Sequence, residues 1–452
     1  MRVREVNLTE GIVWKQVLRF ALPLLLSNLL QQLYSTADLL ILGNFSGRAG
    51  MAAVGAGTFI INSLLGLFIG LGTGGAVMVS AYYGAEDYRR LSKSVHTLMG
   101  LSLLASLLLT VLGLGLSRQL LLWTGTPLSV LDGATAYMQI FFAGTLANMI
   151  YNMGSGILRA VGDSQRPFIF LAVSVLVNVL LDLLFVAAFG WGVAGAAWAT
   201  ILSQCAAALL VLYSLHQSDM PYRLFFRDIR LDRQELGLIL KIGLPAGLQA
   251  VLVNFSNVLI QSVVNSFGEA SVAGFSAAMR LDGFIFTTIS ALSLAVMTCT
   301  GQNVGARRYD RVRRGFFSTL GICVGVSLFL GLFFLALAGP ICASFNRDPE
   351  VIRYAVRCLT YMFPLYWVFG FNEVVGAGLR GTGRSLAPML ISLICMCALR
   401  MLWIFGVLPH NWSIDVVFMA YPLAWIVTFV VQGLYALKTR FLQPPPEQQV
   451  RG

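Results

Sequence analysis

The chain has 452 residues, of which 57% are hydrophobic and only 11% are charged. Soluble globular proteins carry about 25% charged residues, so this composition excludes a soluble protein and indicates an integral membrane protein. The formal net charge of +11 alone could suggest a nucleic-acid partner. The distribution of the basic residues along the chain excludes that interpretation.

Long apolar runs recur along the whole sequence. A helix that crosses a bilayer needs about 20 mostly apolar residues. Twelve runs meet this length, and they predict transmembrane spans at residues 15–42, 51–80, 93–116, 132–157, 166–189, 192–214, 240–267, 272–300, 314–338, 351–377, 386–409 and 413–437. The longest stretch between spans runs from His216 to about Leu240. No soluble domain fits in what remains.

The basic residues gather in alternate loops. With the N-terminus in the cytoplasm, 24 of the 31 Lys and Arg residues fall in the tails and the cytoplasmic loops, and only Arg280 and Arg400 lie in or near spans. Lys and Arg favour the cytoplasmic side of a membrane, so this bias orients the chain with both termini inside. We therefore expect a multi-pass protein of a cell inner (plasma) membrane, with the lipid bilayer as partner and no nucleic acid.

The first predicted span carries an acidic residue, Asp38. A carboxylate inside a membrane helix costs about 2.5–3.5 kcal/mol on insertion scales, and such residues are usually functional. Asp38 either faces a water-filled cavity, where it binds a proton or cation, or pairs with a polar neighbour inside the helix bundle. The first interpretation is favoured because span five supplies a second acid, Asp182, with Asn178 four residues earlier on the same helix face.

Short matches recur at an offset of 221 residues. Gly84, Ala85 and Tyr88 match Gly305, Ala306 and Tyr309, Leu158-Arg159 matches Leu379-Arg380, and Pro167 matches Pro388. The matches predict two copies of a six-span unit, residues 1–214 and 241–452, joined by a cytoplasmic linker at 215–240. The expected fold is all-α, with twelve transmembrane helices in two six-helix bundles related by a pseudo-two-fold axis along the membrane normal. Paired repeats of this kind are typical of secondary transporters.

The second half differs in its buried charges. It has no acid opposite Asp38, and its own intramembrane acids are Asp282 and Glu373. Asp282 could form an internal ion pair with the nearby Arg280. Glu373 could line a cavity or bind a cationic substrate.

The cysteines and histidines indicate neither a disulfide framework nor a metal centre. The seven cysteines lie in or beside apolar runs, and the three histidines are scattered. We expect no cofactor. A membrane-embedded enzyme would need a His, Ser–His or metal constellation at membrane depth, and none is visible, so we expect a protein that is not an enzyme.

Several motifs together resemble one transporter family. The two halves each open with Leu-Pro, span four ends in GILRAVGDSQRP (156–167), and GAGLRGTGRSLAP (376–388) echoes it. NVLLD (178–182) is followed by GVAGAAWATILSQ (192–204). In order and spacing, residues 10–440 resemble the multidrug and toxic compound extrusion (MATE) transporters. The resemblance implies export of organic cations and drugs against an inward flow of H⁺ or Na⁺.

The resemblance also implies a cation site in the first half. The family's first-lobe site matches Asp38, Asn178, Asp182 and Thr200. A second-lobe acid used by another branch is replaced here by Val253-Asn254, so the chain is similar to the DinF-like branch, which relies on the first lobe. We hypothesise that Asp38 and Asp182 face each other across a cavity. Two buried carboxyls cannot both ionise cheaply, so a proton, or a Na⁺ held by these four residues, would remove the penalty.

Aromatic, Met and acidic side chains near the predicted cavity are candidates to contact a flat, cationic substrate. They are Tyr34, Met149, Tyr151, Met279, Asp282, Tyr361 and Glu373. Each of the aromatic and Met residues is more often plain packing than a ligand contact.

Two other functions remain open at this stage. A lipid-linked oligosaccharide flippase of the same superfamily is the nearest alternative, although such chains usually carry a basic central cavity. A channel fits the composition, but the repeat and the buried acids argue against it. The sequence names neither the substrate nor the coupling ion, and nothing in it requires more than a monomer.

Overall fold

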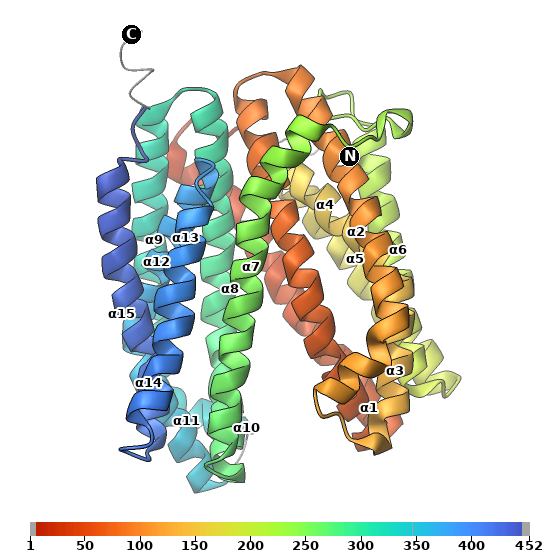
Figure 1. Cartoon of the computed structure of the whole chain (residues 1–452), viewed down its shortest axis with the longest axis vertical. Coiled ribbons are helices and arrows are strands. Elements are labelled where there is room, and N and C mark those ends of the chain that lie inside the picture. Colours follow the sequence, from red (N-terminus) through yellow and green to blue (C-terminus); the bar gives the residue numbers. More distant parts are fainter. Residues whose placement is uncertain (1–5, 346, 445–452) are drawn as a thin grey trace. The chain divides into compact units, whose positions relative to one another are not determined.

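The computed structural model describes residues 6–345 and 347–444, and within these ranges all regular structure is helical (Figure 1). The expected cytoplasmic location of the two chain ends falls on residues outside the described ranges. Two compact units divide the chain, and each is described by itself.

The helices follow one another with short connections. In the first half they are α1 (Val13–Gly84), α2 (Tyr88–Trp123), α3 (Leu128–Ala143), α4 (Thr145–Ala160), α5 (Gln165–Asp182), the π-helical turn η1 (Leu183–Ala188) and α6 (Gly192–His216). The linker contains the short 3₁₀ turn η2 (Phe226–Asp228). The second half holds α7 (Arg233–Asn265), α8 (Glu269–Gly305), α9 (Tyr309–Ala336), α10 (Ala338–Phe345), α11 (Pro349–Met362), η3 (Phe363–Leu365), α12 (Tyr366–Gly381), α13 (Leu386–Ile391), the π-helical turn η4 (Ser392–Ala398), α14 (Leu399–Val407) and α15 (Ile414–Thr439).

The first two predicted spans form one continuous helical assignment, α1, that is broken at Gly47. Gly47 has φ 66° and ψ −166°, which lies outside helical geometry. Only glycine adopts this region without strain, because it has no Cβ. The kink falls where the sequence predicts an outer loop, so α1 supplies two membrane passages.

Nine helices within the described ranges are long and apolar enough to cross a membrane. The other three predicted spans correspond to the first part of α1, to α3 with α4, and to α11 with α12. Polar residues such as Gln31 and Gln32 lower the hydropathy of the first part of α1. The other two passages are interrupted, at Gly144 and at η3, which contains Pro364. All twelve predicted spans therefore have a helical counterpart.

The two units divide the chain at slightly different places from the division expected from the sequence. The first unit contains Val6 and residues 22–247, and the second contains residues 7–21 and those from 248 onward. Helices α1 and α7 thus each change unit near their proline, Pro23 or Pro245. The linker, expected as a separate segment, belongs to the first unit. The predicted two-fold axis between the halves stays a prediction.

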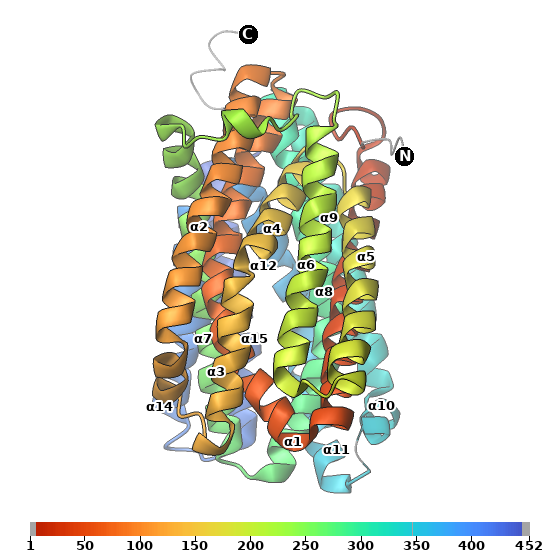
Figure 2. The ribbon, with the colours of Figure 1, turned by 90° about the vertical axis from the view of Figure 1, so that its right-hand side faces the viewer.

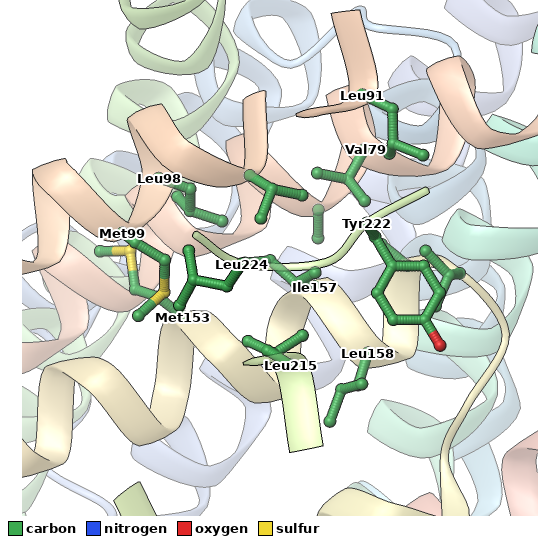
Figure 3. Packing of buried hydrophobic residues seen from close by; sticks show 14 of the residues in the cluster. Val79, Leu91, Leu98, Met99, Met153, Ile157, Leu158, Leu215, Tyr222 and Leu224 are labelled. Atoms are coloured by element: carbon green, nitrogen blue, oxygen red, sulfur yellow. The ribbon is translucent and has the colours of Figure 1, made fainter. Parts of the chain in front are cut away.

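The linker belongs to the first unit because it inserts side chains into its core. Tyr222 and Leu224 are fully buried and pack against Ile157, Leu158 and Leu215 (Figure 3). Further along, Lys93 Nζ of α2 lies 2.9 Å from Asp232 Oδ2. Within the same unit, α5 and α6 lie side by side (Figure 2).

Residues 7–21 belong to the second unit because α8 and α9 hold their backbone. Asn303 Nδ2 donates to Leu8 O at 3.1 Å, and Arg308 Nη1 donates to Thr9 O at 2.6 Å. Arg311 donates to the carbonyl oxygens of Glu10 at 2.8 Å and of Gly11 at 2.9 Å. These side chains satisfy carbonyl groups that precede the first helical turn.

Glycines allow a very close approach of α1 and α7 inside the first unit. A Cβ on Gly74 would lie 2.6 Å from Gly243 N, and one on Gly70 would collide with the backbone of Gly247. Gly70 and Gly74 are four residues apart, as are Gly243 and Gly247, so each pair lies on one helix face. Small residues at this spacing let membrane helices pack backbone to backbone.

Candidate cation site in the first unit

The structure brings Asp38 and Asp182 together from α1 and α5. Their exposed fractions are 8% and 0%. The two carboxyl groups are close enough to share a hydrogen bond once one of them carries a proton. Without that proton, Asp38 Oδ1 and both oxygens of Asp182 have no hydrogen-bond partner. Buried carboxylate oxygens without partners are costly, so this place favours a proton or a cation.

Asn178 and Thr200 complete the predicted set. Asn178 lies one helical turn before Asp182, is fully buried, and has neither its amide oxygen nor its amide nitrogen paired. Thr200 of α6 is buried, and its Oγ1 lies 3.2 Å from the hydroxyl of Tyr34. Tyr34, predicted as a substrate-cavity residue, lies one turn before Asp38 on α1 and is within electrostatic range of it.

Tyr137 of α3 also lies at this site and was not expected from the sequence. Its side chain is buried, lies within electrostatic range of Asp38 and Asp182, and is near the side chain of Thr58. Nothing in the sequence distinguishes it, because a tyrosine in an apolar run reads as packing. The packing of α3 against the other helices brings it to the two acids.

The helix that carries Asp182 changes its geometry directly after it. Helix α5 ends at Asp182 and continues as the π-helical turn η1. A π-turn inserts an extra residue into the helical repeat, and such turns are frequent at functional sites. The site is built from carboxylate, amide and hydroxyl oxygens, which suit a hard cation or a proton. Within the described ranges, no group of three or more His, Cys, Asp or Glu side chains could hold a metal ion.

A separate cavity of about 370 Å³ lies in the first unit near the Gly47 kink. Ser46, Gly50, Gly133, Val186 and Val193 are among its lining residues. Val186 belongs to η1, one turn beyond Asp182. None of the predicted cation-site residues lines this cavity.

The expected ion pair between Arg280 and Asp282 is wrong. Asp282 Oδ1 accepts a hydrogen bond of 2.6 Å from the Tyr366 hydroxyl. Arg280 is exposed and lies over the ring of Phe345, with 6.0 Å between the guanidinium carbon and the ring centroid. Residues two positions apart on a helix point in different directions, which separates the two side chains.

Arg400, expected in or near a span, is buried. It lies inside the passage Leu386–Val407. Its Nη1 donates to Asn257 Oδ1 at 3.2 Å, and its guanidinium carbon lies 4.4 Å from the centroid of the Tyr421 ring. The sequence does indicate a special role for Arg400, because Arg is rare at membrane depth.

The other predicted substrate-cavity residues are distributed over both units. In the first unit, Met149 is fully buried in the hydrophobic core, and the Tyr151 hydroxyl donates to Pro167 O at 3.3 Å. In the second unit, Met279 and Tyr361 are half-buried. Glu373 of α12 is within electrostatic range of Arg380, whose Nη1 donates to Gln249 Oε1 at 3.4 Å. Only Tyr34 lies at the Asp38 site.

Comparison with known proteins shows the family of the chain. The MatE family profile matches the chain twice, at residues 23–184 and 245–405, which repeats the internal spacing. The probable multidrug resistance protein YpnP of Bacillus subtilis is 32% identical over 400 residues, covering 88% of this chain and 89% of the relative. The probable multidrug resistance protein YoeA of the same organism is 28% identical, covering 94% and 93%.

A solved structure shows the same fold. The outward-facing structure of a multidrug resistance MATE family transporter of the MOP superfamily superimposes with a TM-score of 0.88 at 23% identity, covering 97% of this chain and 98% of that one. The family match and the B. subtilis relatives, together with the apolar helices, place the chain among multi-pass membrane transporters, which are not enzymes. The chain belongs to the MatE family, the multidrug and toxic compound extrusion transporters.

Proposed function

We propose that this protein is an antiporter that exports small organic cations, including drugs, in exchange for inward H⁺ or Na⁺, in a cell inner membrane. The observation that carries the proposal is the contact between Asp38 and Asp182, whose buried oxygens lack partners. The names of the B. subtilis relatives, both multidrug resistance proteins, support the export of drugs. They do not favour a lipid-linked oligosaccharide flippase.

The mechanism follows from competition between the coupling ion and the substrate for the same two carboxyl groups. When a proton or Na⁺ occupies the Asp38–Asp182 pair, the negative charge of the site falls by one and a cationic substrate is attracted less strongly. When the ion leaves, the two carboxylates attract the substrate. Each ligand then stabilises a different conformation, which is the differential affinity that shifts a two-state equilibrium between inward and outward access.

The four predicted residues serve either coupling ion. A proton would be shared by the carboxyl groups of Asp38 and Asp182. A Na⁺ would be coordinated by the same carboxylates with the side-chain oxygens of Asn178 and Thr200. The Tyr34 hydroxyl, which lies 3.2 Å from Thr200 Oγ1, would then donate its hydrogen to that oxygen.

The test is efflux of a fluorescent organic cation from proteoliposomes, first under a pH gradient alone and then under a Na⁺ gradient alone. We expect one gradient to drive efflux, and Asp38→Asn to abolish it while membrane insertion stays normal. Asp132→Asn is the matched control, because Asp132 lies in an exposed ion pair with Arg118 and should transport as the wild type does. Gradient-driven efflux by Asp38→Asn at the wild-type rate would refute the proposal.

A further inference from the structure

The second unit buries a cation that has no ion-pair partner among the described residues. Arg400 is 4% exposed, and its Nη1 donates a hydrogen bond to the neutral side-chain amide of Asn257. Its Nε has no hydrogen-bond acceptor. Asp282 is close enough to act electrostatically on Arg400, but the two side chains form no ion pair. One donor of a buried charge is therefore left open.

A second buried hydrogen-bond donor belongs to Trp425, whose ring packs near that of Tyr421. Trp425 is 3% exposed, and its indole Nε1 has no hydrogen-bond partner. Its ring centroid is 6.3 Å from that of Tyr421, the ring on which Arg400 lies. A buried indole N–H usually finds an acceptor. The unpaired donors of Trp425 and Arg400, two residues that pack against the ring of Tyr421, are therefore two independent indications of an absent acceptor.

Asp282, the acid close to Arg400, does not supply that acceptor. Asp282 is engaged by the hydroxyl of Tyr366, at 2.6 Å. The ring of Tyr366 in turn contacts Trp425, with 5.2 Å between centroids. Other polar neighbours include the hydroxyl of Ser256 and the thiols of Cys358 and Cys397, which carry no negative charge in their ordinary protonated form.

We propose that the arginine cluster, defined as Asn257, Asp282, Tyr366, Arg400, Tyr421 and Trp425, binds the carboxylate or phosphate group of a small aromatic anion. A guanidinium group presents several N–H donors in a plane and matches the oxygens of such groups. Arg400 would donate from Nε and its free Nη hydrogens, and Trp425 from Nε1. The aromatic rings would contact the apolar part of the ligand.

The charge of the cluster selects the ligand. A bound anion would contact the Arg400 guanidinium directly, which Asp282, bonded to Tyr366, does not do, whereas a cation would be repelled by Arg400. An unpaired charge at membrane depth is costly, and such residues are usually retained for a ligand or an ion pathway. The proposal concerns the second unit and stands whether or not Asp38 and Asp182 couple transport to an ion.

The test is isothermal titration of the purified full chain in dodecyl maltoside with benzoate and with phenyl phosphate. Benzyl alcohol and benzylammonium are the neutral and cationic controls. We expect saturable binding of at least one anion and no binding of the controls. Arg400→Gln should weaken anion binding at least tenfold, because it removes a charged donor. Arg280→Gln, which removes an exposed arginine of the same unit, should bind as the wild type does.

A second variant keeps the test informative if Arg400→Gln does not fold. Trp425→Phe preserves an aromatic ring but removes the N–H, and it should weaken anion binding about threefold to tenfold. Asp38→Asn should keep anion binding while losing cation-driven export, which separates this proposal from the proposed function. Absence of anion binding in the wild type, or unchanged binding in both cluster variants, would overturn the proposal.

A further arm of the experiment determines whether the bound anionic group comes from a lipid or from a soluble molecule. The titrations are repeated in nanodiscs of phosphatidylcholine and in nanodiscs that contain phosphatidylglycerol. If the anionic lipid weakens benzoate binding, and this competition is lost in Trp425→Phe, lipid phosphate occupies the cluster. If the lipid has no effect, the occupant is a soluble anion. Both results support an anion site at Arg400.

Discussion

Asp182 and Arg400 lie in corresponding passages of the two repeats, and each lies within two residues of a π-helical turn. Asp182 ends α5 directly before η1, and Arg400 follows η4 at the start of α14. Both side chains are buried. The same passage therefore carries a buried acid in the first unit and a buried base in the second. Internal duplication supplied one scaffold, and the two copies now present opposite charges.

Tyr137 gives the first prediction, because its hydroxyl lies near both acids of the cation site. Tyr137→Phe removes one polar group and keeps the ring. We expect the coupling ion to bind about threefold to tenfold more weakly, the effect of one hydrogen bond of about 0.5–1.5 kcal/mol. Export measured against ion concentration should shift to higher concentration and keep its maximum.

The matched control for this prediction is Tyr213→Phe, because Tyr213 is an exposed tyrosine of α6 in the same unit. Its ion dependence should be that of the wild type. An unchanged ion dependence in Tyr137→Phe would show that the hydroxyl takes no part in the site.

The close approach of α1 and α7 gives the second prediction. In Gly74→Ala the new methyl group would meet the backbone of Gly243 at 2.6–2.8 Å, and backbone cannot move aside as a flexible side chain can. We expect a loss of about 1–3 kcal/mol in stability, as for other overpacked sites. The melting temperature in detergent should fall.

Gly72→Ala is the control for the glycine contact. A Cβ on Gly72 has no neighbour within 4 Å, so this variant should melt at or above the wild-type temperature. Equal melting temperatures for the two variants would contradict the backbone contact that the structure shows.

The membrane passages and the first-unit site could be predicted because polar groups are expensive in lipid. An acid such as Asp38 is conspicuous in an apolar run, and Asp182 with Asn178 four residues before it points to one helix face. The same signal is present at Arg400, which lies inside the predicted span 386–409, but its contacts with Asn257 and Tyr421 depend on how the helices pack.

The contacts of the second unit and of the linker could not be predicted in the same way. Asp282 contacts Tyr366, which lies 84 positions away, rather than the neighbouring Arg280. Tyr222 sits in a polar, basic linker, and its full burial depends on helices that follow and precede it. Such contacts arise from the packing of helices, which no local pattern records.

Asp232 gives a prediction on pH. Its side chain accepts hydrogen bonds from Lys93 and from the backbone N–H groups of Glu235 and Gln234, and these lower the pKa of Asp232 below its ordinary value. A lowered folded-state pKa contributes stability that is present above the unfolded pKa, about 4, and is lost as the pH falls through the folded value. The contribution is therefore full at neutral pH and disappears in acid.

The measurement for Asp232 is the melting temperature of the wild type and of Asp232→Asn between pH 3 and pH 7. The wild type should melt higher at neutral pH, and the difference should shrink below about pH 4. Lys93→Gln, which removes the first partner, should reduce the difference at neutral pH. A difference that widens as the pH falls would contradict a lowered pKa for Asp232.

Arg311 gives the last prediction, because its guanidinium donates to the carbonyl oxygens of Leu8, Glu10 and Gly11. Arg311→Gln removes these charge-assisted bonds, each worth about 1.5–3 kcal/mol where the groups are well buried and less where they are exposed. Local opening of residues 7–11 should become more frequent. Hydrogen exchange followed by mass spectrometry should show at least tenfold faster exchange there, with no change in the first unit.

The control is Arg313→Gln, because Arg313 is a neighbouring exposed arginine of α9, and this variant should exchange as the wild type does. Protection of residues 7–11 that survives in Arg311→Gln would show that Asn303 and Arg308 alone hold the segment.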